Sequence, residues 1–150
     1  MKIRSSHLAI AALVVSLASF AGPREDAQAM VESAATHAKS VGEAKALQDF
    51  MKDPEWKRGE LFVFAFDGDG KVLASGAYPK LVGRNLADIK DPTGKPWVKD
   101  MLALAAKAPH AGWVEYEWVN PETKKMTTKI SYVKRIDGST SLVGVGYHKD

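Results

Sequence analysis

The densest group of residues that could do chemistry lies between residues 112 and 132. Two indoles, two phenols, an ammonium and a hydroxyl occur there, on Trp113, Trp118, Tyr116, Tyr132, Lys129 and Ser131. Such groups combine apolar bulk with hydrogen-bonding tips, which a small pocket for a polar ligand needs. The same rings could instead form the core of a half-buried sheet. Both interpretations stay open from these residues alone.

The stretch is predicted to form two antiparallel strands. Aromatic and β-branched residues dominate both arms, and the polar, proline-containing residues 120–124 predict a turn between them. A period of two places Tyr116 and Trp118 on one face of the first arm. On the second arm, Lys129 and Ser131 share a face and Tyr132 lies on the opposite one. Either a bulge intervenes or only one set lines a pocket.

The first 21 residues have the layout of a secretory signal peptide. Lys2 and Arg4 precede an apolar run of about 13 residues, too short for the ~20 that a membrane-spanning helix needs. Cleavage after Ala21 fits the small-residue rule and is preferred to cleavage after Ala29, which would cut a predicted helix. An uncleaved anchor is the alternative. We therefore expect a leader at 1–21 and one periplasmic domain at 22–150.

Charge and composition exclude several classes of protein. The formal net charge of +3 falls to +1 once Lys2 and Arg4 are removed, and Lys and Arg never cluster beyond two adjacent residues. Nucleic acid is therefore not an expected partner. Without cysteine, the exported domain must be held by its apolar core rather than by disulfides.

Catalytic and metal-binding patterns are not found. Glu115 and Glu117 share a strand face, which is interpreted as the solvated side of the hairpin. The histidines of the exported chain are far apart and lack ligand spacing, so His37, His110 and His148 are interpreted as surface residues. We expect neither an enzyme nor a bound metal or cofactor.

The order of elements predicts an α+β domain with one antiparallel sheet of about five strands and a long N-terminal helix. A DGDG turn is preferred to a calcium loop, because Tyr78 stands where that loop needs an acid. Gly144 and Gly146 share a strand face that a neighbouring backbone or a ligand should approach closely. The helices are expected at 23–40, 43–52 and 96–107, and the strands outside the hairpin at 60–66, 71–75 and 141–147.

Four segments together carry a resemblance to a known family. They are FAFDGDGKVLA, PKLVGRNLADIKDPTGKPWVKDM, GWVEYEWVNPETKKMTTKISYVKR and VGVGYHK, in this order along the chain. They closely resemble the bacterial single Cache domain, a PAS-like sensory fold, and particularly its standalone periplasmic members. The resemblance covers about 125 residues, which is nearly all of the chain after the leader.

The resemblance implies an extracytoplasmic domain that binds a small carboxylate such as acetate, propionate, pyruvate or lactate. It implies pocket-wall roles for Tyr116, Trp118, Lys129, Ser131 and Tyr132, with Arg84 as an outer candidate. Arg84 could equally tie its own loop to a carboxylate such as Asp88. Many relatives carry His-Pro in the second strand, where this chain has Ser75 and Gly76. The ligand or the size of the pocket is therefore expected to differ.

Two functions follow as expectations. The first is a periplasmic sensory domain without an output domain of its own, which presents a bound organic acid to a membrane chemoreceptor or sensor kinase. The second is an accessory protein-interaction module that keeps the fold without a functional pocket.

Overall fold

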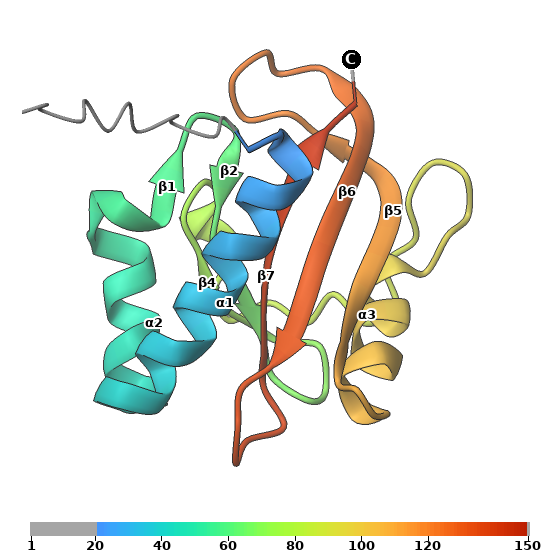
Figure 1. Ribbon diagram of the computed structural model, residues 1–150. Coiled ribbons are helices and arrows are strands. Elements are labelled where there is room, and N and C mark those ends of the chain that lie inside the picture. Colours follow the sequence, from blue (N-terminus) through green and yellow to red (C-terminus); the bar gives the residue numbers. More distant parts are fainter. Residues whose placement is uncertain (1–20, 150) are drawn as a thin grey trace, which may run out of the picture.

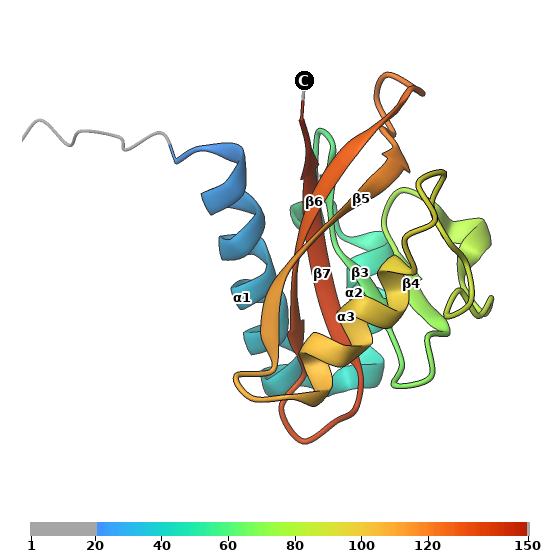
Figure 2. The same cartoon turned by 90° about the vertical axis from the view of Figure 1, so that its right-hand side faces the viewer.

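The computed structural model describes residues 21–149 of the chain. An antiparallel sheet of five strands in the order β4-β3-β7-β6-β5 has helices on both faces (Figures 1 and 2). The predicted α+β class, sheet and long N-terminal helix are confirmed. The predicted leader at 1–21 lies almost wholly outside the described residues. The helices are α1 (Pro23–Val41), α2 (Glu43–Lys52) and α3 (Trp97–Ala106); the sheet strands are β3 (Phe64–Phe66), β4 (Val72–Ser75), β5 (Ala111–Val119), β6 (Met126–Arg135) and β7 (Leu142–His148).

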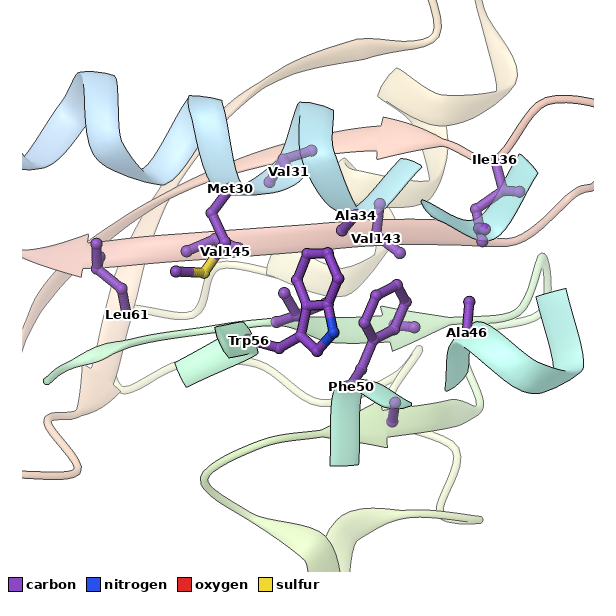
Figure 3. Close-up of a cluster of buried hydrophobic side chains, with 14 of the residues drawn as sticks. Met30, Val31, Ala34, Ala46, Phe50, Trp56, Leu61, Ile136, Val143 and Val145 are labelled. Atoms are coloured by element: carbon purple, nitrogen blue, oxygen red, sulfur yellow. The ribbon is translucent and has the colours of Figure 1, made fainter. Parts of the chain in front are cut away.

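Helix α1 covers one face of the sheet and α3 the other (Figure 2). A stripe of mostly small residues on α1 is buried, and it lets the helix lie close to β7 and β6. Met30, Val31 and Ala34 meet Val143 and Val145 of β7 there (Figure 3). Cleavage after Ala29 would remove the first two turns of α1, whereas cleavage after Ala21 leaves the helix whole.

The predicted strand at 60–66 is divided in the structure. Its first part, β2 (Leu61–Phe62), pairs with the short β1 (Lys57–Arg58), and its second part, β3, pairs with β4 and β7. Val63 lies between them and bonds instead to Trp56 and Gly76. Residues 61–66 are all buried, as the continuous apolar run indicated.

His37 is not the exposed residue expected from its place beside the α1 stripe. Its Nε2 lies 2.8 Å from Asp49 of α2, and its ring centroid lies 5.2 Å from that of Trp56 in the 3-10 turn η1 (Pro54–Trp56). Helical periodicity could not show this, because α2 folds back along α1 and brings these partners from outside the helix.

A buried carboxylate fixes the segment that precedes α3. Asp91 Oδ1 accepts hydrogen bonds from the Thr93 and Lys95 amides and the Thr93 hydroxyl. Its Oδ2 accepts one from the Glu117 amide of β5 at 2.9 Å. These bonds, the Glu117 bond first, lower the pKa of Asp91 to about 2. The loop is thereby tied to the outer strand of the sheet.

We expect this tie to make stability depend on pH. A folded-state pKa near 2, against about 4 in the unfolded chain, means that the ionised carboxylate stabilises the fold above pH ~4. That contribution is lost as the pH falls from about 4 to about 2. Asp91→Asn should lower the urea midpoint at neutral pH, and its difference from the wild type should narrow over this acid range. Asp137→Asn is the control, because Asp137 is exposed and its carboxylate lies 3.8 Å from Lys39, beyond hydrogen-bonding distance. A constant difference down to pH ~2 would contradict the assignment.

Candidate ligand-binding site

A small cavity lies on the α3 face of the sheet, and aromatic side chains form most of its wall. The rings come from the sheet, from α3 and from the segment after β4. They belong to Phe62, Phe64, Phe66, Tyr78, Trp97, Tyr116 and Trp118. Polar groups in the wall come from Ser75, Lys129 and the two tyrosines. Apolar walls with a few placed polar groups are typical of small-molecule sites.

Strand register decides which hairpin residues reach this cavity. The pairing of β5 with β6 is continuous from Ala111↔Lys134 to Val119↔Met126, so no bulge breaks the alternation. Lys129 pairs with Tyr116 on one side and with His148 of β7 on the other. Residues paired in this way share a face of the sheet. Tyr116, Lys129 and His148 therefore form one row across the cavity face.

Two glycines of β7 make room for this row. A Cβ on Gly146 would lie 2.2 Å from Ser131 Oγ and 2.5 Å from Lys129 Cε. A Cβ on Gly144 would lie 2.3 Å from the Phe64 ring. The sequence predicts a close approach of a backbone or a ligand at this face, whereas the groups that approach are side chains of and beside the cavity wall.

Lys129 is buried without a counter-ion. Its side chain is 1% exposed, and Nζ lies 4.3 Å from the Phe62 ring centroid and 5.5 Å from that of Phe64. Within residues 21–149 no carboxylate lies within 4 Å of Nζ. Burial lowers the pKa of Lys129 to about 7, against the opposing charge of Glu60. The ring faces give the ammonium a weaker attraction than a carboxylate would.

Glu60 and His148 are the ionisable neighbours of Lys129. The Glu60 carboxylate accepts from Asn120 Nδ2 at 2.9 Å and from the His148 amide at 3.3 Å. His148 Nδ1 lies 2.8 Å from Thr127 Oγ1, and its Nε2 has no partner among the described residues. Burial first, and then the charge of Lys129, lower the pKa of His148 to about 4. The imidazole is therefore neutral at pH 7.

Donors without acceptors occur in the cavity wall. Trp97 stacks on Tyr116 with ring centroids 4.5 Å apart and planes 3° apart. Its buried Nε1 has no hydrogen-bond partner within the described chain. The Tyr116 hydroxyl lies 3.0 Å from Ser131 Oγ, and burial raises the pKa of Tyr116, which keeps the phenol protonated. A group that accepts hydrogen bonds and carries negative charge would satisfy these donors.

Four of the six expected site residues lie together. Tyr116, Trp118 and Lys129 line the cavity, and Ser131 bonds to Tyr116 directly beside them. Tyr132 lies on the opposite face, where its ring packs 5.0 Å from Trp113 and its hydroxyl lies 3.5 Å from Glu32 of α1. The expected role of Tyr132 in the pocket wall is therefore wrong, because the unbroken register turns it toward α1.

Arg84 contacts neither of its two expected partners, the ligand pocket and the Asp88 carboxylate. Its side chain is exposed and does not line the cavity, and Asp88 pairs instead with Lys99 of α3 at 2.9 Å. The main chain of Arg84 has the structural role, since its carbonyl accepts from the Val72 amide of β4.

Other wall residues were not foreseen. Trp97 and Tyr78 also line the cavity, and no pattern in the sequence marked either as a site residue. Alternation over residues 62–66 could have shown that the three phenylalanines share one face. His148, expected at the surface, is 7% exposed. No sequence pattern marked it, because its burial depends on pairing with β6.

The cavity is small. Its volume of about 30 Å³ accommodates two or three waters, since one water needs roughly 10–15 Å³. A surface hollow of about 440 Å³ lies directly outside and shares Tyr78, Leu81 and Trp118 with it. These three side chains therefore separate the two spaces. The Tyr78 hydroxyl donates to the Val119 carbonyl at 2.7 Å, which fastens this partition to β5.

None of the helices that the structure describes combines the length and apolar character needed to cross a membrane. The described residues also contain no cluster of three or more metal-ligating side chains.

Comparison with characterised proteins gives two curated relatives. A sensor histidine kinase, MctS, of Rhizobium johnstonii is 30% identical over 94 residues, which are 63% of this chain and 20% of the kinase. A methyl-accepting chemotaxis protein, McpP, of Pseudomonas putida is 28% identical over 120 residues, which are 80% of this chain and 22% of that protein. The chain thus spans about a fifth of the length of these relatives.

Solved structures share the fold. A methyl-accepting chemotaxis protein from Vibrio parahaemolyticus superposes with a TM-score of 0.74 at 19% identity, covering 85% of this chain and 88% of the other. A Cache chemosensory domain, solved to explain its carboxylic acid recognition, gives a TM-score of 0.70 at 24% identity and covers 84% and 92%.

The family model described as a Cache domain matches residues 24–150. This range includes the sheet, nearly all of the helices on its two faces and every wall residue of the cavity. Cache domains are sensory ligand-binding domains that lie outside the cytoplasm. The chain belongs to the Cache-domain family and contains a single such domain.

Proposed function

We propose that this domain is a periplasmic sensor that binds a small organic acid in the cavity beside Lys129. The observation that carries the proposal is a buried lysine with no carboxylate within 4 Å among the described residues. It shares the cavity wall with Trp97, whose indole N–H has no acceptor within the described chain. A carboxylate leaving water needs a cation and donors to offset its desolvation. The surrounding phenyl and indole rings suit a ligand with a short apolar tail.

The relatives support this proposal at the level of class. They include a sensor kinase and a chemoreceptor, and one structural neighbour recognises a carboxylic acid. We propose that the bound domain reports to a membrane chemoreceptor or sensor kinase and has no catalytic role. Export would require the leader at 1–21, and cleavage after Ala21 is consistent with the start of α1 at Pro23.

A ligand larger than water must enlarge the cavity. The partition formed by Tyr78, Leu81 and Trp118 is the natural place, because its displacement joins the cavity to the hollow outside. Its ties are few: Leu81 lies in the 3-10 turn η2 (Pro79–Leu81), and the Tyr78 hydroxyl makes one bond to β5. Movement of Tyr78 and Leu81 therefore leaves the strand pairing intact, whereas Trp118 belongs to β5 and packs 5.0 Å from Trp97 of α3.

The small volume favours a second candidate function. If the partition does not open, the domain is an accessory interaction module with the Cache fold and no ligand. Binding of small acids distinguishes the two functions directly.

We expect acetate, propionate, pyruvate or lactate to raise the melting temperature. A ligand at 100 times its Kd stabilises the folded state by about 2.7 kcal/mol. Lys129→Met should remove the shift while the free domain stays folded, because a buried methionine costs less desolvation than a buried ammonium. Tyr116→Phe should weaken binding, whereas the matched Tyr132→Phe, on the opposite face, should not. A shift that survives Lys129→Met would refute the site, and no shift with any acid would support the accessory module.

We expect Tyr78→Phe to speed ligand exchange. Loss of the bond to the Val119 carbonyl removes about 0.5–1.5 kcal/mol that holds the partition closed. Association and dissociation should therefore both accelerate, by up to about tenfold, with little change in Kd. Stopped-flow tryptophan fluorescence can follow this, because Trp97 and Trp118 line the cavity. Tyr147→Phe is the control on the opposite face; unchanged rates in Tyr78→Phe would show that ligand enters elsewhere.

A further inference from the structure

We propose that ligand binding in this cavity is coupled to the uptake of a proton by Lys129, and that the charge of Glu60 sets the pH range of the coupling. The inference rests on the proposed function. Its geometric basis is the position of Nζ, which faces the Phe62 and Phe64 rings and lies beyond 4 Å from every carboxylate in the described chain. An ammonium held in this way pays for desolvation without an ion pair, so the neutral amine competes with it near neutral pH.

The groups around Lys129 identify which charges act on it. The sheet neighbours are Tyr116 on β5 and His148 on β7. Tyr116 stays protonated, and His148 is neutral above pH ~4. From β2 and β3 come only phenyl rings, and from α3 comes the Trp97 indole. The end of β4 adds the Ser75 hydroxyl, and the segment after β4 adds the Tyr78 phenol.

Glu60, just before β2, is the carboxylate whose charge favours the ammonium. It acts from a distance, because its two oxygens are engaged by Asn120 and by the His148 main chain. Burial disfavours the charged form of Lys129, whereas the negative charge of Glu60 favours it. The effect of burial is the larger, and the pKa of Lys129 falls to about 7.

The direction of the linkage follows from these charges. A carboxylate binds the protonated form of Lys129, and by reciprocity it raises the pKa of Lys129 in the complex. Below pH ~7 the free domain already carries the proton, so affinity is constant until the ligand itself is protonated. Above pH ~7 each bound ligand must bring a proton with it. Affinity then falls about tenfold for each pH unit until the pKa of the bound state is reached.

The domain would therefore report an organic acid together with the acidity of its surroundings. The same concentration of carboxylate would give higher occupancy at about pH 6 than at about pH 8. A receptor that depended on a permanently charged arginine would not show this difference.

Calorimetric titration of the full chain with acetate, propionate, pyruvate and lactate tests the inference. Titrations between about pH 5.5 and 9, each in two buffers of different ionisation enthalpy, give both affinity and the number of protons exchanged. We expect constant affinity below pH ~7, an approximately tenfold loss for each pH unit above it, and uptake approaching one proton per ligand near pH 8. NMR titration of the Lys129 side chain in the free domain should give a pKa of about 7.

Glu60→Gln separates the linkage from the contacts with the ligand. Loss of this negative charge should move the midpoint of the affinity profile to lower pH and leave the affinity near pH 5.5 almost unchanged. The matched control is Glu117→Gln, because Glu117 lies on the opposite face and accepts from Thr128. That variant should keep the wild-type midpoint.

The outcomes distinguish the inference from the function on which it rests. Binding with no proton uptake and no loss of affinity up to about pH 9 would overturn the proton coupling and leave the organic-acid sensor intact. An equal midpoint in wild type and Glu60→Gln would overturn the role of Glu60. Absence of binding by all four acids, even near pH 5.5, would overturn the proposed function itself.

Discussion

The structure depends on one unfavourable placement, an ammonium buried among aromatic rings without a carboxylate beside it. Lys129 occupies this place because Gly146 of β7 leaves space for its side chain and because Phe62 and Phe64 cover it. A lysine in such a position costs stability unless something of opposite charge joins it. The proposed function follows from this cost, because an anion beside Lys129 would offset it.

The two faces of the sheet are packed differently. On the α1 face, alanines and branched residues pack closely (Figure 3). Polar side chains such as Tyr132 and His37 have partners on the helices there. Large rings occupy the α3 face, where Lys129 is buried against Phe62 and Phe64 with no carboxylate within 4 Å among the described residues. Close packing on one side gives a rigid support. The unsatisfied side can then change around a ligand without loss of the fold.

The segments that cover the cavity also differ in how firmly they are held. Tyr78 and Leu81 belong to the segment after β4, and Trp118 lies near the end of β5, so none of the three lies in a helix that packs on the sheet. The segment before α3 is held more firmly, by Asp91 and its four hydrogen bonds. One part of the cover is thus fixed and another is lightly tied, as a site that admits a small solute requires.

Much of the architecture could be predicted from the sequence because it depends on local patterns. Periodicity and capping residues gave helices within one or two residues of α1, α2 and α3, and alternation gave the β5–β6 hairpin. The quoted segments were sufficient to indicate the Cache family. Alternation also placed Lys129 and Ser131 together and Tyr132 apart, but it could not say which set faced the cavity. The two faces of a strand are equivalent until the helices that cover them are known.

Tertiary structure decided the remainder of the site. Trp97 and Tyr78 reach the cavity from segments distant from the hairpin, and Glu60 and His148 meet behind Lys129 only because β7 pairs with β6. Arg84, in contrast, is turned outward by a loop whose main chain bonds to β4. These contacts join residues far apart in the chain, so no local pattern encodes them. The residue types and the order of elements were set by the sequence alone; the burial of Lys129 without a counter-ion was set by long-range packing.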